Sequence, residues 1–134
     1  MSIFNVLNTG IFSKLTGSTA LITALGGTSI FYMQAPDSQA LPYVVWSYMG
    51  GGPENISQGN LQSDLVYVRA YATASGQAGT IDNLCDAQLH RQAISVSGFV
   101  NIWTAREEDI ALVENPPSGV KIYSVGGIYR VRVR

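Results

Sequence analysis

The sequence predicts an α+β fold, with a mostly antiparallel twisted sheet of four to five strands and two main helices packed on one face. Three observations lead to this class. Residues 3–25 have helical apolar spacing, residues 63–73 alternate in the manner of a strand, and one long helical segment at 76–93 separates the remaining strands. Runs of strands interrupted by a single helix favour α+β over a parallel sheet. The length of 134 residues suits one domain, which we place at 1–134.

The N-terminal segment is predicted to be helical in two pieces. Apolar residues recur at helical spacing from Phe4 to Leu15, and residues 16–18 then interrupt the pattern. Ser18 or Thr19 can cap a second, short helix by accepting a backbone hydrogen bond. Gly26 and Gly27 stop that helix, as glycines commonly do at a C-terminus. We therefore expect a pair of helices before the first strand.

The next strands are predicted at residues 29–34 and 43–49, where β-branched and aromatic side chains are frequent. The glycines at 50–52 and Pro53 are expected to end the second of these strands. The polar residues that follow, as far as Asn60, are expected to form a mobile loop. This segment should therefore join two strands without adding to the sheet.

Residues 63–73 are the clearest strand in the sequence because their side chains alternate in kind. We expect one face to be small and apolar and to pack on a helix, and it carries Val66, Val68, Ala70 and Ala72. The other face is larger and amphipathic, and we expect it to meet water or a partner. Its residues are Leu65, Tyr67, Arg69 and Tyr71.

Residues 76–93 are predicted to form the second long helix. Its apolar stripe consists of Ile81, Leu84, Cys85 and Leu89. We place Asp82 in the early part of this helix and Arg91 near its end, where each charge would favour the helix dipole. The stripe is expected to cover the small apolar face of the strand at 63–73.

The last third of the chain is predicted to return to strands. They lie at 99–104 and 110–113, on either side of a charged segment at 106–109, and a loop at 114–119 leads to a final strand from 120 or 122 to 134. Gly126 and Gly127 lie within the final strand and suggest a bulge or bend there.

The composition points toward surfaces that are covered by partners. Charged residues make up only 13% of the chain, against about 25% in typical soluble domains, while hydrophobic residues make up 46%. Uncharged polar residues can coat part of the surface, and we expect subunit contacts to cover another part. The net charge of −1 disfavours a general nucleic-acid binder, which would usually be strongly basic.

The sequence also bears on the compartment. A single cysteine, Cys85, excludes an internal disulfide and fits a reducing compartment such as cytoplasm. The N-terminal residues lack the basic region of a signal peptide, and no apolar run approaches the ~20 residues that cross a membrane. We therefore expect no membrane association.

Residues with catalytic potential are few. His90 is the only histidine, no Gly-x-Ser-x-Gly nucleophile elbow is present, and Cys85 falls on an apolar stripe. The glycines at 50–52 lack the lysine and hydroxyl residue that complete a phosphate-binding loop. We therefore expect no enzyme activity, no metal and no cofactor.

Two charged groups are candidates for contacts. Glu107, Glu108 and Asp109 could offer oxygens to a hard cation, but a solvated acidic turn or one side of an intersubunit contact is favoured. Alternation places the C-terminal arginines on one face of the final strand. Their charge could keep an exposed strand soluble, or it could form a basic patch that binds an acidic partner or a phosphate backbone. The candidate interface residues are Leu65, Tyr67, Arg69, Tyr71, Glu107, Glu108, Asp109, Arg130, Arg132 and Arg134.

Several segments occur in an order and spacing that suggest a family. They are residues 11–15, 20–27, 30–31, 35–36 and 41–45, the strand 66–73, the helix 78–91, the acidic residues 107–109 and the final strand 128–133. Together they resemble the tail terminator (tail completion) proteins of long-tailed bacteriophages. The polar segment at 53–62 and the proline pair at 116–117 depart from the family pattern.

The resemblance implies a homo-hexameric ring that caps the tail tube, ends its polymerisation and joins the tail to the head connector. Its partners would be the tail tube protein and the head-completion (stopper) protein, with DNA passing through the ring without sequence-specific binding. The protein would reside at the head–tail junction of the virion, and in the host cytoplasm during assembly. The resemblance implies no catalytic residue and no cofactor.

Two alternatives remain open from the sequence. The first is another neck protein, such as a head-completion or stopper subunit. The second is a small cytoplasmic ligand-binding domain, which would need an apolar pocket with converging polar groups.

Overall fold

The computed structural model describes residues 3–54, 61–117 and 119–134. The loop predicted as far as Asn60 therefore lies largely outside the described residues. Along the chain the elements are α1 (Phe4–Thr16), α2 (Thr19–Leu25), β1 (Ile30–Tyr32), β2 (Tyr43–Pro53), β3 (Gln62–Ala72), α3 (Ser75–Leu89), β4 (Asn101–Glu114) and β5 (Ile122–Val133). No helix among these residues is long and apolar enough to span a membrane.

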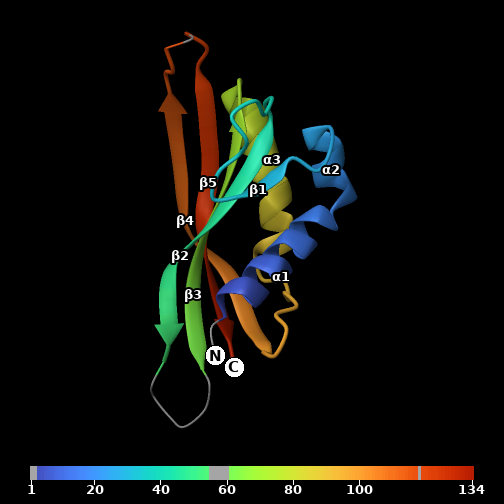
Figure 1. The fold of residues 1–134 in the computed structure, drawn as a ribbon, viewed down its shortest axis with the longest axis vertical. Helices are drawn as coiled ribbons and strands as arrows, with labels where there is room; N and C mark the ends of the chain where they lie inside the picture. The colour runs from blue at the N-terminus through green and yellow to red at the C-terminus, as the bar shows by residue number, and fades with distance from the viewer. Residues whose placement is uncertain (1–2, 55–60, 118) are drawn as a thin grey trace.

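The strands form one twisted sheet in the order β1-β2-β3-β5-β4, and the helices lie together on one of its faces (Figure 1). The pair β1–β2 is parallel and the other pairs are antiparallel. The predicted α+β class with a mostly antiparallel sheet is therefore confirmed, with one parallel pair as an addition.

The core lies between the sheet and the helices, as the alternation in β3 predicts. Val66, Val68 and Ala70 of β3 belong to the same buried cluster as the α3 stripe and the α1 leucines. Val68 is 1% exposed and Leu89 of α3 is fully buried. The small side chains of β3 let α3 approach the sheet, and α3 contacts β3 and β5.

Helix α2 begins and ends at the residues that the sequence predicts. Ser18 precedes α2 and its hydroxyl accepts a hydrogen bond from the Leu21 amide at 3.3 Å, which satisfies one of the amides left free at a helix start. Gly26 closes the helix with a left-handed φ of 74°, which costs a glycine little.

The prediction that glycines 50–52 end the second strand is wrong. Strand β2 continues through them to Pro53 and stays paired with β3, with a register shift between Tyr48 and Gly50. A Cβ on Gly51 would lie 2.3 Å from the carbonyl oxygen of Ser63. Glycine therefore permits a close approach of β2 and β3 here, and the strand is prolonged rather than broken.

The predicted helix at 76–93 ends four residues early, at Leu89. Arg91 adopts a left-handed φ of 57°, and its amide donates to the carbonyl of Thr104 at 2.6 Å. The chain leaves the helix to cover part of strand β4, so Arg91 does not complement the helix dipole. Asp82 also departs from expectation, because it lies in the middle of α3 and is 6% exposed.

The last third contains one long strand where two short ones are predicted. Strand β4 runs continuously from Asn101 to Glu114, and the charged segment lies within it. The predicted irregularity at Gly126 and Gly127 is absent from β5, which is regular across both glycines. Two register shifts fall instead in β4, one between Asn101 and Trp103 and one between Arg106 and Glu108.

Candidate functional site

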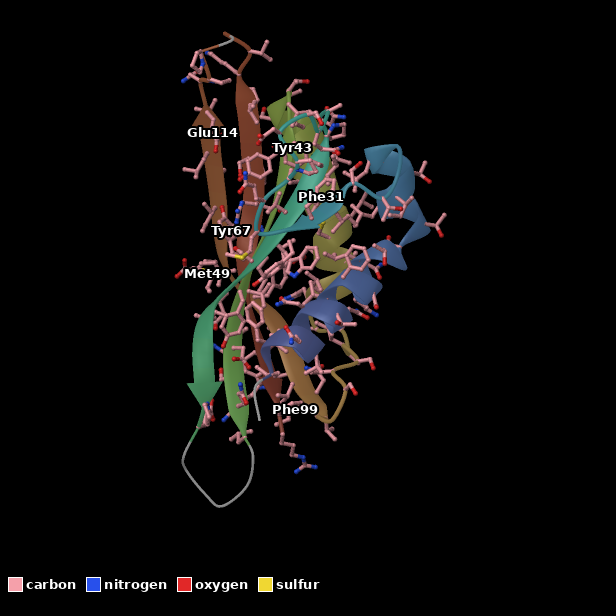
Figure 2. All side chains as sticks on the ribbon, in the orientation of Figure 1. Phe31, Tyr43, Met49, Tyr67, Phe99 and Glu114 are labelled. Carbon is pink, nitrogen blue, oxygen red and sulfur yellow. The ribbon has the colours of Figure 1, made fainter. Side chains whose placement is uncertain are left out.

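The sheet surface opposite the helices, here called the open face, carries the amphipathic side of β3. Leu65, Tyr67, Arg69 and Tyr71 alternate with the buried residues of that strand and are each half-buried. Tyr71 lies opposite Tyr43 of β2, and the two rings are 5.2 Å apart between centroids. Figure 2 shows Tyr43 near Phe31 and Tyr67 closer to the middle of the sheet.

Arg69 is held between two tyrosines on this face. Its guanidinium carbon lies 4.7 Å from the ring centroid of Tyr67 and 5.9 Å from that of Tyr71. Its Nε donates to the Tyr71 hydroxyl at 2.7 Å, and Nη1 donates to the hydroxyl of Ser47 at 3.3 Å. The cation is thus fixed in place before any partner arrives.

Two tyrosines of the open face, Tyr67 and Tyr43, are held in their neutral form by burial. Burial raises the pKa of Tyr67, and Arg69 only partly opposes this effect. Burial also raises the pKa of Tyr43, and neighbouring Tyr71 adds to the shift. Neutral tyrosines with an ordered arginine are side chains enriched at protein interfaces, and they form no nucleophile or acid–base pair.

The predicted row of C-terminal arginines is largely neutralised within the subunit. Arg130 pairs with Glu107 and donates to the Ser63 hydroxyl at 2.7 Å. Arg132 donates to a carboxylate oxygen of Glu54 at 2.6 Å. Such partly exposed pairs stabilise a fold by about 1 kcal/mol or less each. They leave little free charge for a phosphate backbone, while Arg134 remains exposed at the chain end.

The acidic residues 107–109 lie inside strand β4, so the expectation of an acidic turn is wrong. Glu107 pairs with Arg130, whereas Asp109 pairs with Arg106 on the helix side of the sheet. Glu108 is exposed. Their carboxylates therefore diverge, and no group of three or more His, Cys, Asp or Glu side chains among the described residues could hold a metal ion.

A second polar cluster lies on the helix side and centres on Arg106. Its guanidinium bonds both carboxylate oxygens of Asp82, at 3.0 and 2.9 Å, and donates to the Gly126 carbonyl at 2.8 Å. It also donates to the Tyr129 hydroxyl at 3.1 Å, and that hydroxyl donates to Asp86 at 2.9 Å. The cluster ties helix α3 to strands β4 and β5.

The sequence analysis does not predict the Arg106 cluster, although the spacing of two aspartates in α3 indicates a shared cation. Asp82 and Asp86 are four residues apart, so they share one face of α3 and both point toward the same cation. Burial alone would lower the pKa of Arg106, but the hydrogen bond with Asp82 and the charges around it hold that pKa above its ordinary value. The guanidinium is therefore a permanent structural cation.

The residues with catalytic potential have structural roles. The Nδ1 atom of His90 accepts a hydrogen bond from the Arg106 amide at 3.0 Å. Cys85 is 1% exposed, and burial raises the pKa of its thiol well above the ordinary value. A reactive cysteine needs the opposite shift, toward the thiolate. The geometry therefore shows no reaction centre at His90 or Cys85.

The chain is similar to a known protein family and, in fold, to solved structures of low sequence identity. The model of the family described as "Tail completion protein gp17" matches residues 9–117. A chain from the solved structure "Virion of native gene transfer agent (GTA) particle" is 15% identical, with a TM-score of 0.71, and the match covers 98% of this chain and 97% of that one. A second solved chain is 14% identical, with a TM-score of 0.61, and the match covers 100% and 96%. No curated protein matches.

Proposed function

The chain belongs to the tail completion protein gp17 family, and from this premise we propose that six copies form a ring that caps the phage tail tube. The protein is a structural component of a phage tail. The proposed ring ends tube polymerisation and presents a surface to the head connector. The number six comes from the resemblance to tail terminators and not from any contact within this subunit.

The open face supports the proposal most directly. Arg69 is preordered between Tyr67 and Tyr71 on a face that the helices leave uncovered. Tyrosine and arginine are typical of the residues that contribute most to binding. Because their positions are already fixed, a neighbour would order few side chains on contact. A charged fraction of 13% also fits a subunit that is partly covered in its working state.

Ring closure requires two different surfaces on each subunit, because a heterologous contact places one patch against another. We propose the open face, centred on Leu65, Tyr67, Arg69 and Tyr71, as one such surface. The pairs of Arg130 with Glu107 and Arg132 with Glu54 border it and can exchange partners with a neighbour. Glu108 and Arg134 are exposed charges that would lie near its rim, whereas Asp109 is exposed on the helix side and would contact a neighbour only from there.

The proposed partners are the tail tube protein on one side of the ring and the head-completion (stopper) protein on the other. DNA would pass through the centre without sequence-specific binding, in keeping with a net charge of −1 and internally paired arginines. The subunit would assemble in the host cytoplasm and reside at the head–tail junction. It would act without catalysis, in keeping with a family of phage tail completion proteins.

The decisive experiment combines a structure with a deletion. Reconstruction of the head–tail junction should show six copies in one ring on the last layer of the tube, around an open channel or DNA. Phage that lack this protein should produce tails of irregular length. Tails of normal, uniform length in the deletion would refute the terminator role even if a ring were seen, and a ring on the head side alone would favour a stopper.

A further inference from the structure

Strand β4 forms one margin of the sheet and is long for an edge strand. The strand order places β4 at one edge and the three-residue β1 at the other. In Figure 1 the end of the β4–β5 hairpin, where the two strands are connected, rises above the other strands and the helices. An edge strand exposes backbone N–H and C=O groups on one side, which other chains can pair with unless something covers them.

The first half of the β4 edge is covered. The Thr104 carbonyl accepts from the Arg91 amide, and the Arg106 amide donates to Nδ1 of His90. Residues of an antiparallel strand turn their backbone groups alternately toward and away from the partner strand. After the register shift beyond Arg106, the residues turned away from β5 are therefore Asp109, Ala111 and Val113.

The second half of the edge is free. Among residues 3–54, 61–117 and 119–134, no backbone hydrogen bond reaches the outward groups of Asp109, Ala111 or Val113. The side chains are also accessible, since Leu112 is 57% and Val113 51% exposed. One edge thus has a covered half and a free half, and only the free half can accept another strand.

We propose that this free half, Asp109–Val113, binds an extended basic segment of another protein as an additional strand. On the helix side, the edge borders a depression of about 360 Å³ between α3 and β4. Its lining includes the carboxylates of Asp82, Asp86 and Asp109 and one guanidinium, that of Arg106. Three negative charges against one positive charge leave a formal −2, so lysine or arginine on an incoming strand would complement this side.

A second copy of this chain fits the free half poorly. Antiparallel self-pairing centred on Ala111 would place Glu108 opposite Glu114, and like charges directly opposite destabilise a pair of strands. The other edge of the sheet, at β1, lies in a stretch from 27 to 42 that contains no lysine or arginine. The charge pattern therefore favours a different protein, and the inference holds whether or not the chain forms a ring.

The test uses the whole protein and two terminally blocked synthetic peptides, one alternating lysine with valine and one alternating glutamate with valine. We expect the lysine peptide to slow amide exchange at Asp109, Ala111 and Val113 by about tenfold or more at saturation. Exchange at Ile110 and Leu112, whose amides face β5, should change little. The glutamate peptide should have no effect.

The variant Ala111→Pro makes the test specific. Proline removes an outward N–H and leaves the β4–β5 ladder intact, so the fold should persist while peptide binding is lost. Ala111→Val keeps the N–H and should bind like the wild type. Binding retained by Ala111→Pro, equal binding of both peptides, or no protection by the lysine peptide would overturn the proposal. Protection that rises with protein concentration alone would show that a second copy is the occupant, which also overturns it.

Discussion

The guanidinium of Arg106 lies so close to the backbone of Gly127 that a Cβ built there would meet Nε at 2.4 Å and Cζ at 2.6 Å. The guanidinium thus packs directly on the backbone of Gly127 while it forms hydrogen bonds with Asp82 and Tyr129. The requirement for glycine comes from this close approach and from the carbonyl oxygen of Glu108, which the Cβ would meet at 2.7 Å. A bulge, which the sequence suggests here, would have been a different reason for the same residue.

Gly127→Ala should destabilise the fold by about 1–3 kcal/mol, because the added methyl forces the guanidinium away from its partners. Gly79→Ala is the matched control. Gly79 lies within α3, and a Cβ there would have nothing within 4 Å. The control should stabilise the protein by about 0.5–1 kcal/mol through helix propensity. Urea unfolding measures the free energy of unfolding of both variants. Equal values would contradict the close packing of Arg106 on Gly127.

Replacing Arg106 alone should lower the free energy of unfolding more than replacing Arg106 and its partner Asp82 together. Arg106→Met leaves Asp82 as a buried carboxylate without its cation, and such losses cost about 3–5 kcal/mol. Adding Asp82→Asn to that variant should recover part of the loss, because the uncompensated charge disappears. Unfolding free energies of the two single variants and the double variant form the required cycle. Strictly additive losses would mean that the pair is not coupled.

The fold was predictable wherever local chemistry and packing point the same way. The alternation in β3 and the stripe of α3 both describe one buried interface, so Val68 and Leu89 could be paired from the sequence. The boundaries that failed depend on contacts distant in the chain. Strand β2 continues past Gly50 because β3 lies close, and α3 stops at Leu89 because the chain turns to cover β4.

The candidate site was predictable in part for the same reason. Strand alternation places Tyr67, Arg69 and Tyr71 on one face without any tertiary information. The partners of charged residues follow no local rule. Arg130 meets Glu107 and Arg132 meets Glu54 only because the strands are ordered as they are, so the arginine row could not be seen as neutralised.

Val68→Asp should destabilise the fold by roughly 3 kcal/mol or more, because it places an unpaired carboxylate in the core between β3 and the helices. Val113→Asp is the control on a strand surface, since Val113 is 51% exposed. It should change stability by no more than ~0.5 kcal/mol. Thermal melts of both variants would decide, and a Val68→Asp protein that melts at the wild-type temperature would contradict the assigned core.

Stability should fall between pH about 10 and about 12, in part through Tyr48. Burial, followed by the hydrogen bond from its hydroxyl to Asp64 at 2.7 Å, raises the pKa of Tyr48 from 10.0 to about 12. In that window the unfolded chain releases this proton and the folded chain retains it, so rising pH favours unfolding. Tyr48→Phe should reduce the decline, as measured by urea unfolding from pH ~9 to ~12. An identical decline in the variant would assign the effect to other groups.

Arg69→Ala should impair ring assembly far more than it impairs folding. The substitution removes the cation between Tyr67 and Tyr71 but leaves the helix-side core unchanged. Its hydrogen bonds to Tyr71 and Ser47 are each worth about 1 kcal/mol, so the subunit should remain folded.

Arg69→Lys separates the charge from the shape of the side chain. Lysine retains the charge but lacks the planar group that packs between two rings, so it should restore assembly only in part. Lys121→Ala, an exposed cation on the loop before β5, is the control and should assemble normally. Electron microscopy of tails from complemented phage gives the length distribution, and melting of the purified subunits gives stability. If Arg69→Ala supported tails of uniform normal length, the open face would not be the ring contact, because its best-ordered charged group would be dispensable.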